Sequence, residues 1–174
     1  MSQSPSPQLD ADRLESNSWV DTPTEELIKH IQINYHQRHR EQLPELIRLA
    51  RRVEQVHGNH PECPNGLADH LSEIQQALES HMLKEEQILF PMLLRGEHEQ
   101  SCGPISVMRF EHEQHGEGLD KLRALTNNIQ PPAHSCNTWR RLYQELNEFS
   151  HDLAQHIQLE NEVLFTRPQN NQLL

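Results

Sequence analysis

One pattern occurs twice in this chain: His-x-x-x-Glu, followed three residues later by Leu-Phe. It occurs as HMLKEEQILFP from residue 81 and as HIQLENEVLFT from residue 156. Residues four apart on an α-helix lie on one face, one above the other. Each His/Glu pair therefore shares its helix face with apolar residues further along. Burying such a pair is unfavourable unless something compensates for it.

A shorter pattern, His-x-x-His, also occurs twice, as HQRH from residue 36 and as HEQH from residue 112. The spacing between the patterns is nearly the same in both halves, with 45 residues from His36 to His81 and 44 from His112 to His156. The chain therefore reads as two helical hairpins related by an approximate twofold. Each hairpin has His-x-x-His on its first helix and His-x-x-x-Glu on its second.

Apolar residues recur at helical spacing, and segments with Gly and Pro at 57–66, 96–104 and 127–137 interrupt them. We expect a first helix from Pro23 with a kink at Pro44, and a second helix over about 67–95. A third helix is expected from Pro104 to about 128, and a fourth over 138–165. With no β-type alternation of useful length, the prediction is an all-α, up-down-up-down antiparallel four-helix bundle.

The length of 174 residues suits one domain with a proper core. Residues 1–20 are rich in Ser, Pro and Asp and are predicted to be a disordered N-terminal tail. The bundle is expected over 21–168, followed by a C-terminal tail at 169–174.

Charge and cysteine content restrict the partners and the compartment. A net charge of −11 argues against nucleic acid and against an anionic membrane as partners. Cys63, Cys102 and Cys136 are far apart and form no C-x-x-C motif, which favours a reducing cytoplasm. No apolar run approaches the roughly 20 residues that a spanning helix needs.

Residue counts from the expected turns place a histidine of each helix in one layer, because helices rise by about 1.5 Å per residue. Four imidazoles and two carboxylates that meet in a bundle core need a metal, and their number suits two metals. The predicted ligands are His36, His81, Glu85, His112, His156 and Glu160.

The donor set favours iron. The chain has no H-E-x-x-H string and no cysteine pair, so the usual zinc sites are excluded. A nitrogen-rich, carboxylate-bridged site suits iron, with manganese or mixed metals as alternatives. We expect each of two irons to bind two histidines, with Glu85 and Glu160 bridging both. An oxo or hydroxo bridge would complete the centre and leave each iron an open position.

Other histidines have weaker assignments. His39 and His115, three residues after a predicted ligand, are either hydrogen-bond partners of the ligands, a further ligand, or surface residues. The remaining histidines have no partner at suitable spacing and are expected to have no metal role: His57, His60, His70, His98, His134 and His151.

Four strings carry a resemblance to a known family: YHQRHREQLPELI, SHMLKEEQILFPML, GPISVMRFEHEQHGE and HIQLENEVLF. From about residue 27 to 168 the chain resembles the hemerythrin-like domain of the iron–sulfur cluster repair di-iron proteins (the YtfE/ScdA family). The resemblance implies a hemerythrin-like bundle whose di-iron ligands fall on the same six residues. Family members also have an N-terminal domain with an adjacent cysteine pair, whereas here no cysteine precedes Cys63.

The resemblance implies a role in repairing iron–sulfur clusters damaged by oxidative or nitrosative stress, by binding iron and donating it to damaged iron–sulfur proteins. This role is non-enzymatic. The alternative is a di-iron redox enzyme or sensor that reacts with nitric oxide, dioxygen or peroxide, for which the sequence identifies no catalytic residue. Simple oxygen carriage is disfavoured unless His39 or His115 supplies a fifth histidine. We expect a monomer or a weak homodimer.

Overall fold

The computed structural model describes residues 18–170, and all regular structure in this range is helical. Residues 1–17 and 171–174, which make up most of the two predicted tails, lie outside the described residues. The elements run in the order α2 (Thr24–Ile31), η1 (Gln32–His36), α3 (Gln37–His57), α4 (Leu67–Lys84), η2 (Glu85–Leu89), α5 (Phe90–Leu94), α6 (His98–Leu125), α7 (Asn137–Leu159), η3 (Glu160–Leu164) and α8 (Arg167–Asn170).

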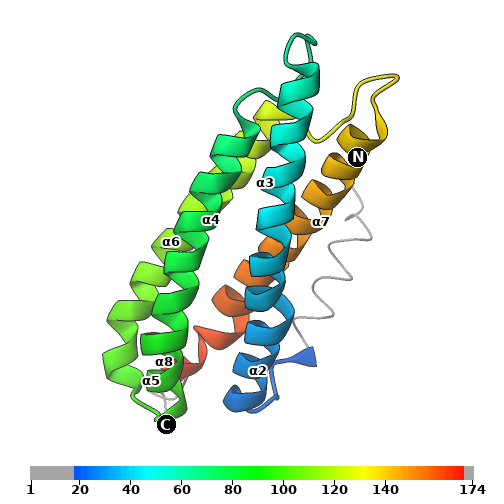
Figure 1. Ribbon diagram of the computed structural model, residues 1–174. Helices are drawn as coiled ribbons and strands as arrows, with labels where there is room; N and C mark the ends of the chain where they lie inside the picture. Colours follow the sequence, from blue (N-terminus) through cyan, green and yellow to red (C-terminus); the bar gives the residue numbers. More distant parts are fainter. Residues whose placement is uncertain (1–17, 171–174) are drawn as a thin grey trace, which may run out of the picture.

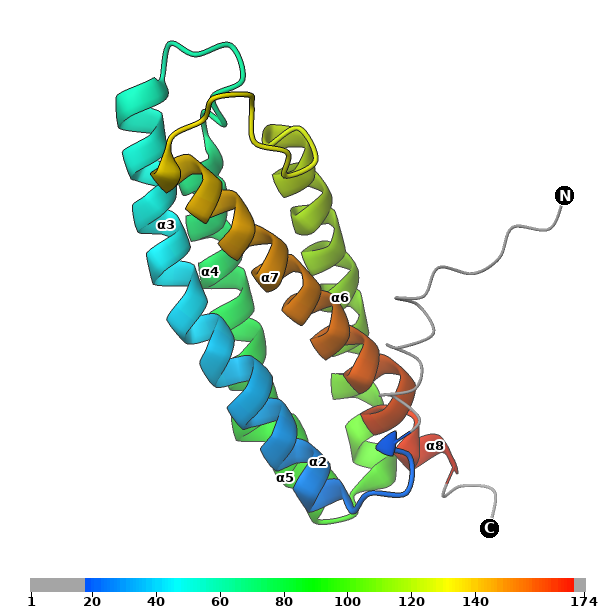
Figure 2. The same ribbon diagram turned by 90° about the vertical axis from the view of Figure 1, so that its right-hand side faces the viewer.

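Four long helical rods result, because η1, η2 and η3 continue their neighbouring α-helices without a break. Figures 1 and 2 show these rods side by side, with the α3–α4 and α6–α7 loops at one end and α2, α5 and α8 at the other. Helix α3 packs against both α4 and α7, and α4 also packs against α6. The prediction of an all-helical protein built on four long helices is confirmed.

The three η segments are π-helical turns, in which a backbone N–H bonds to the carbonyl five residues earlier. The N–H groups of Gln37, Phe90 and Phe165 donate to the carbonyls of Gln32, Glu85 and Glu160, respectively. Such turns are rare and often occur at functional sites. Within the described residues α6 has no π-turn, so the bulges are confined to the other three rods.

The apolar core consists of two clusters. One lies toward the α3–α4 and α6–α7 loops and is built around large, fully buried side chains such as Trp139, Tyr143 and Phe149. The other lies toward α2 and α5 and includes Phe90 and Phe165. Along each rod, buried polar residues separate the two clusters, so the site described below lies in a polar layer between two apolar ones.

The third helix begins earlier than predicted. It starts at His98 rather than Pro104, and Pro104 lies inside it. Proline at the first helical position is a strong start signal, whereas a proline in the second turn removes one hydrogen bond and its ring crowds the carbonyl four residues earlier. Burial of Ser101, Ile105 and Met108 against the rest of the bundle compensates for that loss.

No helix in the described part of the chain is long and apolar enough to cross a membrane.

Candidate metal centre

The six predicted ligands meet in the polar layer. None of their side chains is more than 3% exposed. They form two groups of four, and within each group the ligand atoms all lie within 4.8 Å of one another. Each group has two histidines of its own and both groups share the two glutamates: His36, His156, Glu85 and Glu160 in the first, and His81, His112, Glu85 and Glu160 in the second.

The π-turns lie at this layer. Glu85 is the first residue of η2, Glu160 is the first residue of η3, and His36 is the last residue of η1. A π-turn holds one more residue per turn than an α-helix, so it changes which face the following side chains present. The turns therefore allow the ligands, and the apolar residues next to them, all to face the core. Leu89 and Leu164, which end η2 and η3, are buried in this way.

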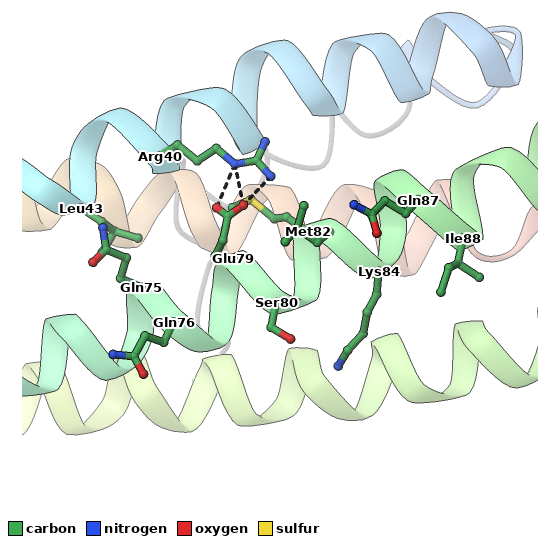
Figure 3. A pocket seen from close by; sticks show the side chains of 11 residues that line it. Arg40, Leu43, Gln75, Gln76, Glu79, Ser80, Met82, Lys84, Gln87 and Ile88 are labelled. Atoms are coloured by element: carbon green, nitrogen blue, oxygen red, sulfur yellow. Dashed lines mark hydrogen bonds and ion pairs between the residues drawn. The ribbon is translucent and has the colours of Figure 1, made fainter.

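His36 is fixed by a carboxylate behind its ring. Its Nδ1 lies 2.9 Å from Oε1 of Glu86. Arg40 donates to both oxygens of Glu86 at 2.8 and 3.0 Å, and also to Glu79. Figure 3 shows Arg40 reaching from α3 to Glu79 on α4. Because a carboxylate only accepts, Nδ1 of His36 carries the proton and Nε2 presents a lone pair to the core.

The second group is fixed in the same manner. Nδ1 of His81 lies 2.9 Å from Oε2 of Glu111, and Lys84 donates to the other oxygen, Oε1, of the same carboxylate. Nδ1 of His112 lies 2.8 Å from Oδ1 of Asn161. Both rings donate outward through Nδ1, so both Nε2 lone pairs face inward.

A longer chain of hydrogen bonds fixes His156. The amide nitrogen of Gln42 donates to Asp152 at 2.8 Å, which orients the amide so that its oxygen lies 3.3 Å from Nδ1 of His39. His39 therefore donates from Nδ1 and accepts at Nε2, which lies 3.1 Å from Nδ1 of His156. As a result, Nε2 of His156 also presents a lone pair, toward Oε1 of Glu160 at 2.8 Å.

In these tautomers, the Nε2 lone pairs of the four histidines face one another and the oxygens of the two glutamates. Nε2 of His81 and Nε2 of His112 are 3.1 Å apart, and Nε2 of His36 is 3.1 Å from Oε2 of Glu85. Nε2 of His36, both oxygens of Glu85 and Oε2 of Glu160 are buried without a hydrogen bond. Buried acceptors that face one another require a cation between them, so the donor set fits metal ions.

Protons take the place of metal when none is bound. Burial acts to lower the pKa of His36, but hydrogen bonds to Glu160, Glu85 and Glu86 outweigh it and raise the pKa to about 11. Burial is likewise outweighed at His81, where hydrogen bonding and charge interaction with Glu85 raise the pKa to about 9. Burial acts to raise the pKa of Glu160, but its histidine neighbours bring the pKa well below the usual range. Negative charge at the carboxylates therefore dominates the layer.

His39 and His115 are both buried, and neither belongs to the two ligand groups. His39 is the hydrogen-bond partner of His156, one of the alternatives that the sequence left open. Burial lowers the pKa of His39 to about 2 and that of His115 to about 3, so both rings are neutral. The ring of His115 meets that of His81 edge-on, with centroids 4.9 Å apart.

The residues behind the ligands were not found from the sequence. Glu86, Glu111 and Asn161 each directly follow or precede a predicted ligand in the chain, but nothing in the sequence indicated their role. His70 was expected to have no metal role, and it belongs to neither ligand group; its side chain is 5% exposed, and its Nε2 lies 2.8 Å from the carbonyl oxygen of Gly118.

A surface groove of about 730 Å³ lies outside the layer, over α4 (Figure 3). Its wall includes Arg40, Glu79 and Lys84 but none of the six ligands. The groove therefore reaches the residues that support His36 and His81 without reaching the ligand atoms themselves.

Comparison with known proteins agrees with this donor set. Residues 27–167 match the model of the family described as "Hemerythrin HHE cation binding domain". The chain belongs to the hemerythrin HHE family. It is also 54% identical over 152 residues to the iron–sulfur cluster repair protein YtfE of Yersinia pseudotuberculosis serotype O:1b and to that of Yersinia pestis. Each alignment covers 87% of this chain and 69% of the relative. The predicted family is confirmed, and membership implies cation binding.

Proposed function

We propose that this chain binds two iron ions in the polar layer, each held by two imidazoles and both bridged by the two shared carboxylates. The ligands are His36 and His156 for one ion, His81 and His112 for the other, and Glu85 and Glu160 for both. The observation that carries the proposal is that four Nε2 lone pairs and two carboxylates converge in a buried layer where several acceptors have no hydrogen bond.

The chain's own residues determine how such a centre behaves. Bound iron supplies redox chemistry between its ferrous and ferric states and positions at which a small molecule such as nitric oxide or dioxygen can bind. Glu86 and Glu111 hold two of the imidazoles in the metal-binding tautomer and make them more basic. The two apolar clusters exclude bulk water on both sides of the layer.

We propose further that the chain repairs iron–sulfur clusters damaged by oxidative or nitrosative stress, and that it does so by giving up ferrous iron to damaged iron–sulfur proteins. The support is its relationship to YtfE proteins, which are named for iron–sulfur cluster repair. The six ligands are imidazoles and carboxylates without a thiolate, the donor type that selects iron–sulfur clusters, so this centre differs in its ligands from the clusters that would receive its iron.

We also propose the domain bounds, the helix topology, the location and the oligomeric state of the protein. We assign residues 21–168 to one hemerythrin-like domain with up-down-up-down antiparallel helices, as the short loops at the two ends favour. The three free cysteines are consistent with a cytoplasmic location. We expect a monomer or a weak homodimer.

The test uses protein that has been reconstituted with iron without oxygen and then reduced. It is mixed with an iron–sulfur enzyme whose cluster has lost iron, and recovery of that enzyme's activity is followed. We expect faster recovery with the wild type than with His81→Ala. The variant His151→Ala, which removes an exposed histidine outside the layer, should match the wild type. Equal recovery with wild type and His81→Ala would contradict the proposal.

A further inference from the structure

A series of ring contacts connects the buried layer with the surface. The ring of Tyr35 stacks on that of the predicted ligand His156, with centroids 5.3 Å apart and an angle of 7° between the ring planes. The ring of Tyr35 also meets that of His30 edge-on at 5.7 Å, and the ring of His30 lies 4.1 Å from that of Trp19. Four rings therefore follow one another from a metal ligand to Trp19, each at contact distance from the next.

Hydrogen bonds and packing hold the outer part of this series in place. The side-chain amide of Asn34 lies 2.9 Å from Nδ1 of His30. The carbonyl oxygen of Trp19 accepts a hydrogen bond from Arg167 at 3.0 Å. Trp19 and Tyr35 both pack against the apolar cluster toward α2 and α5. The ring contacts thus belong to the packed part of the protein.

The outer rings can be reached from solvent. Trp19, His30 and Tyr35 line a surface pocket of about 430 Å³, together with polar residues such as Arg38. These three rings are partly exposed, whereas His156 is fully buried. A soluble molecule can therefore approach Trp19 without reaching the ligand atoms.

Tyr35 differs chemically from the other aromatic residues next to the layer. Phe90 and Phe165 stack on the predicted ligands His36 and His112. A phenyl ring is much harder to oxidise than a phenol or an indole. In the part of the chain that the structure describes, the phenol in contact with a ligand ring is that of Tyr35.

A single ferrous ion in the layer would create a need for such a phenol. Hydrogen peroxide takes up two electrons when its O–O bond breaks, but one ferrous ion supplies only one. Without a second electron donor, a hydroxyl radical forms and attacks the nearest side chains, which here are the ligands. An iron donor passes through this state whenever one of its two ions has left.

We propose that Tyr35 supplies the second electron when hydrogen peroxide meets a single ferrous ion in the layer, and that Trp19 then carries the oxidising equivalent to the surface. The peroxide takes one electron from ferrous iron, which becomes ferric, and one electron and one proton from the Tyr35 phenol. Its O–O bond breaks, and it leaves as one water and one hydroxide.

The next two steps restore the protein. Trp19 gives an electron and a proton to the Tyr35 radical, while the imidazole of His30 bridges the two rings without being oxidised. A one-electron donor in solution, such as ascorbate, then returns an electron and a proton to Trp19. The inference rests on the proposed binding of iron, and it gives the chain protection against its own iron under oxidative stress.

The experiment uses metal-free protein that receives one ferrous ion per chain without oxygen and is then mixed with one equivalent of hydrogen peroxide. Tyr35→Phe keeps a ring on His156 but removes the oxidisable hydroxyl. His30→Leu interrupts the series between Tyr35 and Trp19. Tyr143→Phe is the matched control, because it removes the chain's other phenol, in the apolar cluster toward the loops. Iron content and thermal unfolding verify that all four proteins are intact.

The first readout is electron paramagnetic resonance of samples frozen soon after mixing. We expect an aromatic radical in the wild type and in Tyr143→Phe, and its loss in Tyr35→Phe. In His30→Leu the signal should be that of a tyrosyl radical, because the oxidising equivalent stays on Tyr35.

The second readout is mass spectrometry of oxidised peptides, without a reductant. Oxidation of Trp19 should fall severalfold in Tyr35→Phe and in His30→Leu but not in Tyr143→Phe, and oxidation of His156 should rise in Tyr35→Phe. Because Trp19 is partly exposed, metal-free protein mixed with a ferrous chelate and peroxide gives its background oxidation. Added ascorbate should lower the oxidation of Trp19 in the wild type.

An unchanged radical signal and unchanged oxidation of Trp19 in Tyr35→Phe would overturn the inference. An equal fall in Tyr143→Phe would also overturn it, because any phenol would then serve. A wild type that binds no iron would contradict the proposed function together with the inference, whereas bound iron that gives no aromatic radical overturns the inference alone.

Discussion

The Nε2 atoms of His81 and His112 lie 3.1 Å apart in the buried layer, while the Nδ1 atom of each ring donates outward, to Glu111 and Asn161. Two neutral imidazoles in these tautomers would point lone pairs at each other. The contact is stable only with a proton or a metal ion between the rings. The hydrogen bonds to Glu111 and Asn161 therefore determine that both Nε2 atoms are available to a metal ion.

The carboxylate behind His81 should therefore tune metal affinity. We expect Glu111→Gln to weaken metal binding by about tenfold or more, because an amide supports the imidazole less well than a carboxylate does. Competition with a chelator of known affinity measures the change. Glu113→Gln, an exposed neighbour on the same helix, is the control and should bind metal as the wild type does. Equal loss of affinity in the two variants would assign the effect to overall charge instead.

The series of hydrogen bonds that runs from Asp152 through Gln42 and His39 to His156 gives a second prediction. His39→Leu removes the acceptor for Nδ1 of His156 and leaves that buried N–H without a partner, which costs about 1–3 kcal/mol. We expect weaker binding of the ion assigned to His36 and His156. His39→Gln, which can still accept a hydrogen bond, should retain more affinity. Metal titration of both variants checks the order of their affinities. Binding by His39→Leu as tight as that of the wild type would show that His39 does not support the metal ligand His156.

The sequence was sufficient for the fold class and for the convergence of six residues, because a doubled pattern places its members on one face and at one height. It was not sufficient for the π-turns, since a hydrogen bond between residues five apart has no side-chain signature. It also placed the third helix start at Pro104, although tertiary burial extends that helix back to His98.

Residues that support the ligands depend on distances between helices and could not be predicted. Glu86 and Glu111 read as ordinary surface charges until α3 approaches α4 and α4 approaches α6. The hydrogen-bond partner of His70 is a backbone carbonyl on α6, which no spacing of side chains in the sequence reveals.

The raised pKa values of His36 and His81 determine whether metal affinity increases or decreases with pH. At neutral pH without metal both rings carry a second proton, on Nε2, which metal must displace. Metal affinity should therefore rise with pH toward about 9 for His81 and about 11 for His36. Near pH 7, loading should release about two protons per chain. Calorimetry in buffers of different ionisation enthalpy measures this number, and loading without proton release would contradict it.

The same shifts act on the stability of the metal-free protein. Because folding raises these pKa values, the protonated rings stabilise the folded state fully below the ordinary value of 6.5. That stabilisation is lost as the pH rises through about 9 and then about 11. The lowered pKa values of His39 and His115 act in the opposite direction near the ordinary value of 6.5, so the test is made above it. Denaturant unfolding of metal-free protein from pH 8 to 10 should show a decreasing free energy of unfolding. An increase over this range would contradict the assignment.

The apolar clusters should support the layer by ordinary packing. Leu146 is fully buried in the cluster toward the loops. We expect Leu146→Ala to lower the free energy of unfolding by about 2–5 kcal/mol, since it removes buried methyl groups and leaves a cavity. Leu83→Ala, at a side chain that is 38% exposed, should lower it by much less. Equal losses in urea unfolding would contradict this view of the core.

The central claim is that two irons lie between the two pairs of histidines. Anomalous scattering at the iron edge from a crystal of iron-loaded protein tests it most directly. We predict two peaks, one next to Nε2 of His36 and His156 and the other next to Nε2 of His81 and His112, with Glu85 and Glu160 between them. A single peak, a peak ligated by His39 or His115, or no peak in protein that remains folded would contradict the account.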